Sequence, residues 1–234
     1  MTAAYEEFIK RLIAYRKANG YTQAEMGKRS NLTQSHYNKI ENMSKVMSCK
    51  SLAILNDAGI NADFLVTGIE PKHTAINDLL KQCRESDRSC FLYVTAVCIE
   101  IVIMHNRIKD TSYREISTKE IEILRSDIEN RESKDHSIWK TIRKLNSLTQ
   151  EQMSKELDID IKTYRDIEKG KSKPNVEILA TVYDKLGYPP SLILDVENKN
   201  YLYVINEIWL RLSEDLQNKT EEMLRSFFDF ISII

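Results

Sequence analysis

Residues 22–42 read TQAEMGKRSNLTQSHYNKIEN, and residues 149–169 read TQEQMSKELDIDIKTYRDIEK. Both stretches lie within a longer repeat, in which the segment from Arg16 to Asp57 recurs from Arg143 to Asp184, shifted by 127 positions (143 minus 16). A period this long indicates a duplicated domain and not a solenoid of short repeats. The pairs that are identical at this shift include Arg16/Arg143, Thr22/Thr149, Gln23/Gln150, Met26/Met153, Tyr37/Tyr164, Ile40/Ile167 and Glu41/Glu168.

The composition favours helices throughout the chain. Of the 234 residues, 42% are hydrophobic and 29% charged, and there are only 6 Gly and 4 Pro. Apolar residues recur at helical spacing, without the sustained period-two alternation of half-buried strands. A chain of this length can bury a substantial core and suits two domains of ordinary size. We therefore expect an all-α fold with an internal duplication.

No motif in the sequence indicates catalysis or a bound cofactor. The four cysteines lack Cys-x-x-Cys spacing and histidine partners at metal-ligand intervals, so we expect reduced thiols and no metal site. There is no Gly-rich phosphate loop and no nucleophile with a base in a recognisable setting. We expect no enzymatic activity and no cofactor.

The sequence is typical of a cytoplasmic protein. Tyr5-Glu-Glu-Phe interrupts any apolar run near the N-terminus, so no signal peptide is indicated. The apolar stretch from Cys90 to Met104 is shorter than the roughly 18 to 20 residues of a membrane span, and it contains Glu100. We expect this stretch to form a buried or subunit-facing helix, with no membrane involved.

The charge is distributed unevenly along the chain. The formal net charge is -1, but the two repeats are mildly basic and the segments that follow them are acidic. This asymmetry permits an anionic partner at the repeats without requiring one.

Helix start and stop signals divide each repeat into short helices. In the first repeat, a helix over 6–18 ends at Asn19-Gly20, Thr22 and Glu25 form a capping box before 23–30, and Thr33 caps a helix over 34–42. A helix over 48–58 and a last turn at 61–65 follow. The second repeat has the same outline, with helices over 150–157 and 161–169 and a third that ends at Gly187. This is the layout of a DNA-reading helix-turn-helix domain.

These residues resemble the Cro and lambda-repressor-like (XRE) family of helix-turn-helix regulators. The resemblance covers roughly 120 of the 234 residues. In the first repeat it rests on Thr22-Gln-Ala-Glu-Met-Gly, Leu32-Thr-Gln-Ser-x-Tyr-x-Lys-Ile-Glu-Asn and Ile60-Asn-Ala-Asp-Phe-Leu-Val-Thr-Gly. In the second repeat it rests on Leu148-Thr-Gln-Glu-Gln-Met-Ser, Tyr164-Arg-Asp-Ile-Glu-Lys-Gly-Lys-x-Lys-Pro and Leu192-Ile-Leu.

The resemblance implies DNA-contacting residues in the first repeat. In such domains the glutamine that begins the second helix holds a phosphate and braces the recognition helix, which is the third helix of the domain. The positions facing the bases carry Gln, Ser, Asn and Lys here, and Gln can bond adenine bidentately while Lys can donate to guanine. Thr33 is most simply a helix cap. The predicted DNA-binding residues are Gln23, Thr33, Gln34, Ser35, Asn38, Lys39, Asn42 and Lys45.

The matching residues of the second repeat form a less typical set. Ile161 offers only apolar contact with a thymine methyl group, and Asp166 would face a polyanion, so an ordinary helix surface is an equally good interpretation at these two positions. Three lysines follow the recognition helix and suit phosphates. The predicted DNA-binding residues here are Gln150, Ile161, Lys162, Thr163, Arg165, Lys169 and Lys171.

The resemblance also implies a scaffold and one departure from it. Arg16 with Glu41, and Arg143 with Glu168, match an ion pair that ties the first helix to the end of the recognition helix. Small residues, Gly27 and Ser154, stand where two helices approach closely. The first repeat lacks the Gly-Lys-x-x-Pro loop of the second, so we expect its phosphate-holding loop to have a different shape.

A further helical pair follows each repeat. Ile76-Asn-Asp-Leu-Leu resembles Ile205-Asn-Glu-Ile-Trp, and an apolar helix follows each, over 91–104 and 223–234. These helices are more apolar than one buried face requires, so we expect them to pack on each other or on a second chain. The expected domains are a helix-turn-helix at 1–69, a hairpin at 70–110, a charged linker at 111–135, a second helix-turn-helix at 136–196 and a second hairpin at 197–234.

The leading functional hypothesis is a sequence-specific bacterial or phage regulator, most simply a repressor, that binds double-stranded DNA with two recognition helices. The chain would act as an intramolecular pseudo-dimer or as a homodimer. One alternative is a protein-interaction module, in which a helix-turn-helix is degenerate and the apolar helices bind a protein or peptide. Another alternative is an antitoxin that neutralises a partner and represses its own operon.

Overall fold

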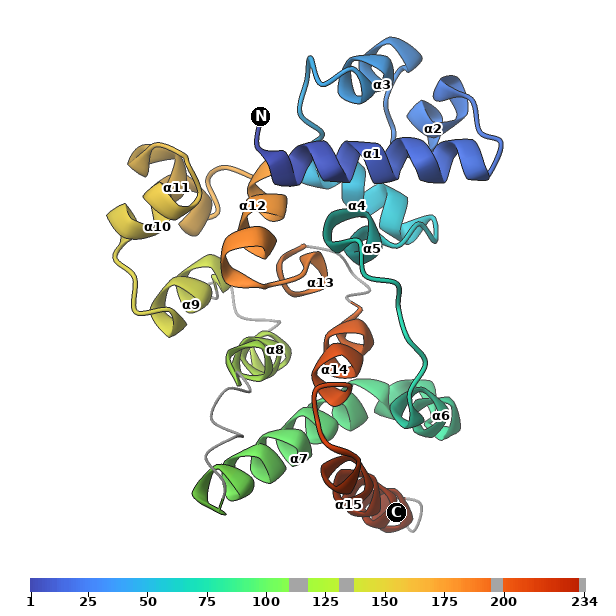
Figure 1. The fold of residues 1–234 in the computed structure, drawn as a ribbon, viewed down its shortest axis with the longest axis vertical. Helices are drawn as coiled ribbons and strands as arrows, with labels where there is room; N and C mark the ends of the chain where they lie inside the picture. The colour runs from blue at the N-terminus through green and yellow to red at the C-terminus, as the bar shows by residue number, and fades with distance from the viewer. Residues whose placement is uncertain (110–117, 131–136, 195–199, 232–234) are drawn as a thin grey trace. The chain divides into compact units, whose positions relative to one another are not determined.

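The computed structural model describes residues 1–109, 118–130, 137–194 and 200–231, and they contain helices and no strand (Figure 1). The all-α prediction is confirmed. The chain divides into two compact units, of which unit 1 comprises Met1–Glu70 and Ser137–Lys199 and unit 2 comprises Pro71–His136 and Asn200–Ile234. Within the expected linker, hairpins and second helix-turn-helix, residues 110–117, 131–136, 195–199 and 232–234 lie outside the described residues.

Unit 1 contains both repeats. The helices of the first repeat are α1 (Ala3–Ala18), α2 (Gln23–Arg29), α3 (Gln34–Glu41), α4 (Cys49–Asp57) and α5 (Ala62–Thr67). Those of the second are α9 (Ile138–Leu145), α10 (Gln150–Glu156), α11 (Ile161–Glu168), α12 (Val176–Leu186) and α13 (Pro190–Ile193). The predicted helices match within about three residues. α1 begins earlier than expected, because the Thr2 side chain accepts a hydrogen bond from the Tyr5 N–H and caps the helix.

The backbone repeats even where the residue types differ. Left-handed φ angles occur at equivalent turns of the two repeats, namely Gly20 and Ser147 (68° and 55°), Asn31 and Asp158 (55° and 52°), and Met43 and Gly170 (56° and 70°). Non-glycine residues adopt this conformation only at a steric cost. Their retention at the same places indicates that the duplication preserved the architecture of each turn.

Contacts between the two repeats join positions that are equivalent to each other. Ser48 and Asn175, the caps of α4 and α12, form an isolated antiparallel bridge, and the Val176 N–H donates to the Met47 carbonyl at 3.0 Å. The Ser191 N–H donates to the Asp63 carboxylate at 2.8 Å, and these residues stand 128 positions apart, at the same place in α13 and α5. Equivalent positions that contact each other are typical of twofold interfaces.

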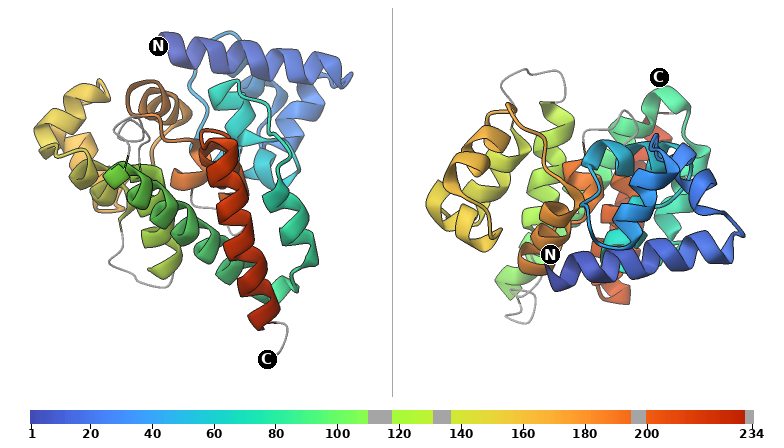
Figure 2. Two further views of the ribbon diagram at one scale, coloured as in Figure 1. Left: turned by 60° about the horizontal axis from the view of Figure 1, so that its bottom comes forward. Right: turned by 90° about the horizontal axis from the view of Figure 1, so that it is seen from above.

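The N-terminal part of α1 adds a second link between the repeats. α1 packs against α12, as Figures 1 and 2 show. The Tyr5 hydroxyl accepts a hydrogen bond from the Met47 N–H at 2.9 Å, and the Thr2 N–H donates to Glu177 of α12 at 2.6 Å. This part of α1 has no counterpart in the shorter α9, so within the described residues the first repeat alone contributes this link.

The buried Asp63 carboxyl makes stability depend on pH. Burial raises its pKa from 3.8 to about 6, despite the hydrogen bond from the Ser191 N–H. The folded protein therefore holds a proton that the unfolded chain releases between these pH values, so stability falls as the pH rises from about 4 to about 6. Asp63→Asn keeps an acceptor without a charge. We expect it to raise the free energy of unfolding at pH 7 by up to about 3 kcal/mol.

Urea unfolding of the wild type and of Asp63→Asn at several pH values between 4 and 7 measures this difference in the free energy of unfolding. The advantage of Asp63→Asn should grow as the pH rises and level off above about 6. An advantage that is constant across this range would show that Asp63 does not titrate in the folded protein within it.

Unit 2 is built from the segments that follow the repeats. Its elements are α6 (Ala75–Gln82), the 3-10 helix η1 (Glu85–Asp87), α7 (Arg88–Lys109), α8 (Lys119–Glu129), α14 (Tyr201–Trp209) and α15 (Glu214–Ile231). α7 packs on α8, α14 and α15, and the rings of Phe91 and Phe228 lie 5.2 Å apart. The expected packing of the two apolar helices on each other is therefore observed. The Asn206 side chain donates to Asn77 at 3.0 Å, again between equivalent positions, which here stand 129 residues apart.

α7 is longer than the apolar stretch from which it was predicted. By length and composition alone, the segment Glu85–Asn106, with 22 residues, is long and apolar enough to cross a membrane, so the length of the apolar stretch does not by itself exclude a span. Polar residues at both ends continue the helix beyond the apolar run. One face of α7 is nevertheless buried against its neighbours, and Arg125 of α8 forms an ion pair with Glu100. Such packing is typical of a core helix in a folded unit.

Candidate nucleic-acid interface

In each repeat two short helices pack closely around a tight turn. A Cβ atom added at Gly27 of α2 would lie 3.1 Å from the Leu32 carbonyl oxygen, which confirms the need for a small residue there. The equivalent Ser154 does carry a side chain, and its hydroxyl donates to the Glu151 carbonyl at 2.9 Å. The recognition helices α3 and α11 are capped as predicted, because Thr33 accepts from the His36 N–H and Asp160 from the Thr163 N–H.

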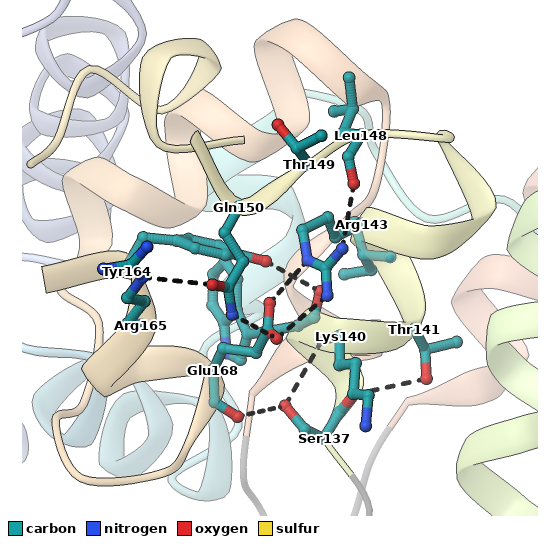
Figure 3. A network of polar contacts seen from close by, with 12 residues as sticks. Ser137, Lys140, Thr141, Arg143, Leu148, Thr149, Gln150, Tyr164, Arg165 and Glu168 are labelled. Atoms are coloured by element: carbon teal, nitrogen blue, oxygen red, sulfur yellow. Dashed lines mark hydrogen bonds and ion pairs between the residues drawn. The ribbon is translucent and has the colours of Figure 1, made fainter. Parts of the chain in front are cut away.

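Both predicted ion pairs are present and have matching geometry. Arg16 donates to both carboxylate oxygens of Glu41, at 2.6 and 3.0 Å, and Arg143 donates to both of Glu168, at 2.8 and 3.1 Å. Each guanidinium also donates to a backbone carbonyl, that of Tyr21 or Leu148. Figure 3 shows this network in the second repeat. The pairs fix the first helix of each repeat to the end of its recognition helix.

The environment of each glutamate favours its ionised form. Burial alone would raise the pKa of Glu41, but hydrogen bonds from Arg16 and Gln23 outweigh burial and lower it. For Glu168 the balance is the same, with Arg143 and Gln150 as the donors. Both ion pairs therefore stay charged at neutral pH and weaken as the pH falls below the ordinary glutamate range.

The two glutamines at equivalent positions of the repeats brace the recognition helices. Gln23 donates to Glu41 at 2.8 Å, and Gln150 donates to Glu168 at 3.0 Å. Bracing by these residues is confirmed, whereas their contact with a phosphate stays a prediction. In the second repeat Arg165 also donates to the Gln150 side-chain oxygen at 3.2 Å, as Figure 3 shows. This bond links a predicted base-reading residue to the brace.

The outer face of α3 is polar and accessible. Thr33, Gln34, Ser35 and Lys39 are exposed and Asn38 is half-buried, whereas Tyr37 and Ile40 lie in the core. The side chain of Asn42, just after the helix, donates to that of Asn38. Lys45 is exposed in the next turn. The structure thus gathers all the predicted contact residues of the first repeat on α3 and its two ends, except Gln23 on the neighbouring α2.

The outer face of α11 is mixed. Lys162 and Arg165 are exposed, as are Lys169 and Lys171 after the helix, whereas Ile161 and Thr163 are half-buried. The Asp160 carboxylate accepts hydrogen bonds from the N–H and the hydroxyl of Thr163, and Asp166 is half-buried on α11. Acidic groups therefore lie among the basic ones. The readout surface of the second repeat is less uniformly suited to a polyanion than that of the first.

The loops after the two recognition helices have the same backbone geometry, contrary to the expectation from sequence. The N–H groups of Ser44 and Lys45 donate to the Lys39 carbonyl at 2.8 and 3.1 Å, and those of Lys171 and Ser172 donate to the Asp166 carbonyl at the same distances. The sequence suggested different shapes because Met43 replaces Gly170. Met43 instead adopts the left-handed conformation that glycine would take.

Two features of this region were missed in the sequence. The guanidinium of Arg29, the last residue of α2, lies over the Tyr21 ring, 4.3 Å from its centre. The contacts of Ser48 with Asn175 and of Asp63 with Ser191 were also missed, although the alignment of the repeats places both pairs in register.

Comparison with known families gives two matches, one on each repeat. A family model described as a helix-turn-helix matches residues 12–47, and one described as a helix-turn-helix domain matches residues 140–199. No curated protein and no solved structure matches the chain. The two family matches confirm the resemblance seen in the sequence.

Proposed function

We propose that this protein, which carries two XRE-type helix-turn-helix domains in tandem, is a cytoplasmic transcriptional regulator that reads one DNA site with both recognition helices. Its most direct action would be repression, because a protein bound across a promoter excludes polymerase. The observation that carries the proposal is the contact between equivalent positions of the two repeats in unit 1.

The contacts at Ser48/Asn175 and Asp63/Ser191 have the form of a twofold dimer interface within one chain. Dimeric helix-turn-helix proteins place their recognition helices in successive major grooves, about 34 Å apart. An intramolecular pseudo-dimer can use the same geometry. We infer that the two repeats occupy the two halves of a single operator.

The exposed polar face of α3 supports base readout in one half-site. Gln34 and Lys39 can bond adenine and guanine edges in the major groove, and Ser35 can serve a base or a phosphate. Lys45, and in the second repeat Lys169 and Lys171, would contact phosphates and make binding steeply dependent on salt. Phosphate contacts position the protein, and the α3 side chains supply sequence preference.

The mixed face of α11 supports a second half-site of different sequence. Lys162 and Arg165 can donate to guanine, whereas the half-buried Ile161 can contact a thymine methyl. Asp166 would repel phosphates and could accept from a cytosine amino group. The operator should therefore have unlike halves.

Selection of bound sequences from a random DNA pool tests this proposal. The wild type should enrich a two-part motif. Gln34→Ala/Lys39→Ala should lose one half of the motif, and Lys162→Ala/Arg165→Ala should lose the other, each with about a tenfold or greater loss of affinity. Each double variant replaces two residues and removes one or two positive charges. The affinity for non-specific DNA therefore serves as the control for the loss of charge. No enrichment by the wild type at low salt would refute the proposal.

One observation favours a second candidate function. Asp160 and Asp166 on α11 suit a protein surface better than a phosphate backbone, which is the arrangement expected of a protein-interaction module or an antitoxin. A palindromic motif that depends only on Gln34 and Lys39 would assign the second repeat to this role. Co-purification of a small second protein would favour the antitoxin.

A further inference from the structure

An apolar stripe runs along the outer side of α7. It consists of Cys90, Val94, Val97, Ile101 and Met104, which we call the α7 stripe. The side chains of Ile101 and Met104 are 50% and 54% exposed, Cys90 is exposed, and the two valines are half-buried. On the opposite side, Phe91, Thr95 and Ile99 are fully buried. α7 therefore has two apolar faces, of which unit 2 buries one.

The spacing of the α7 stripe is that of a coiled-coil seam. Successive members are separated alternately by four and three residues, which is the heptad pattern of helices that pair side by side. The stripe covers about 21 Å of helix, at 1.5 Å per residue. A surface of this kind is narrow and straight, so it suits a single partner helix better than a broad groove would.

α15 provides an internal comparison for this face. It is the second apolar helix of unit 2, and it packs against α7 through a similar pattern of residues. Thr95 and Thr220 are both fully buried, and each donates its hydroxyl to the carbonyl four residues earlier, that of Phe91 or Leu216. Aligning Thr95 with Thr220 superposes the buried Phe91 and Ile99 of α7 on the buried Leu216 and Leu224 of α15.

In that alignment the outer positions of the two helices differ in polarity. The counterparts of the α7 stripe on α15 are all exposed and polar: Asp215, Lys219, Glu222, Ser226 and Asp229. The aligned outward positions of α15 are thus built without apolar residues. Exposed apolar stripes of this length usually mark contact surfaces.

We propose that the α7 stripe is the surface through which two copies of this chain pair, helix against helix. The stripe carries no charge, so a twofold axis can place it against itself without like-charge repulsion. The carboxylate of Glu100, which precedes Ile101, is already held by Arg125 of its own chain, and Arg125 also lies 5.6 Å from the Tyr93 ring. A helix with apolar residues at heptad spacing packs best against another such helix. The described residues of unit 2 contain no other exposed stripe of this kind.

The pairing goes beyond the DNA-reading function of one chain. Two chains joined by their α7 helices would carry four helix-turn-helix domains. Such an assembly could hold two operators at once, whereas a single chain would occupy one.

Sedimentation equilibrium of the full chain over a concentration series tests the pairing. The wild type should approach twice the mass of one chain. Ile101→Lys/Met104→Lys places two charges in the seam and should remain a monomer where the wild type is a dimer. Ser226→Lys/Asp229→Lys makes the same change at the equivalent exposed positions of α15 and should still dimerise. Ile101→Leu/Met104→Leu should also dimerise.

The outcomes separate the possibilities. A wild type that is monomeric at tens of micromolar would overturn the proposal, even if another protein were found to bind the stripe. A dimer that survives the α7 lysines, or one that the α15 lysines also abolish, would equally overturn it. Circular dichroism of each variant checks that unit 2 remains folded. DNA selection by the monomeric variant is a separate readout, so failure of dimerisation and failure of DNA binding are distinguishable.

Discussion

Replacing Arg16 with methionine is expected to lower the free energy of unfolding by about 3–5 kcal/mol. The Glu41 side chain is almost fully buried and receives two hydrogen bonds from Arg16. Without the guanidinium, the carboxylate would keep its hydrogen bond from Gln23 but would have lost its countercharge in a desolvated site. Burial would then raise the pKa of Glu41, so the deficit should shrink as the pH falls and the carboxyl takes up a proton. Chemical unfolding at pH 7 and pH 4 measures both effects.

Two matched variants identify the cause of this loss. Arg143→Met removes the equivalent guanidinium from Glu168 in the second repeat and should cost a similar amount. Arg16→Met/Glu41→Leu removes both charges and should recover much of the stability, because the buried charge is no longer unpaired. If the double variant were as unstable as Arg16→Met, lost packing and not the unpaired carboxylate would be responsible.

Phe8→Ala is also expected to lower the free energy of unfolding by about 3–5 kcal/mol. Phe8 is fully buried on α1, and its ring stacks on Tyr5 with centroids 5.6 Å apart. Tyr5 in turn accepts the Met47 N–H, beside the point where Met47 bonds to Val176 of the second repeat. A cavity at Phe8 would loosen this connection. Calorimetric unfolding measures the loss of stability.

Tyr5→Phe provides the control for this prediction. It keeps the stacked ring and removes only the hydroxyl, so the Met47 N–H loses its partner at a cost of about 1–3 kcal/mol.

Phe8→Ala should also weaken binding to a complete operator more than binding to a half-site. Equal weakening on both DNAs would show that Phe8 does not help to hold the repeats together.

The helix-turn-helix units could be predicted because their signals are local. Thr22, Thr33 and Asp160 cap helices through hydrogen bonds to residues three positions away, and such bonds depend only on neighbouring sequence. The pairing of Arg16 with Glu41 followed from the family resemblance. Residue type and spacing were sufficient for the caps, whereas the ion pair was predicted only through the resemblance.

The remaining features depend on tertiary structure. Nothing local at Asp63 shows that its carboxylate meets Ser191, because the contact joins segments 128 residues apart. Met43 adopts a left-handed turn that its side chain disfavours, since the hydrogen bonds to Lys39 hold the loop in place. The exposed side of α7 likewise could not be separated from its buried side until the helix was placed against α15.

The bridge between Ser48 and Asn175 also bears on how the protein responds to dilution. Association of two separate subunits follows mass action and is lost when a cell contains only a few copies, whereas two domains on one chain remain neighbours at any copy number. Because each domain is encoded separately, a substitution can alter one half of the recognition surface and leave the other unchanged. The halves of such a regulator, and of the DNA site it reads, are therefore free to evolve apart.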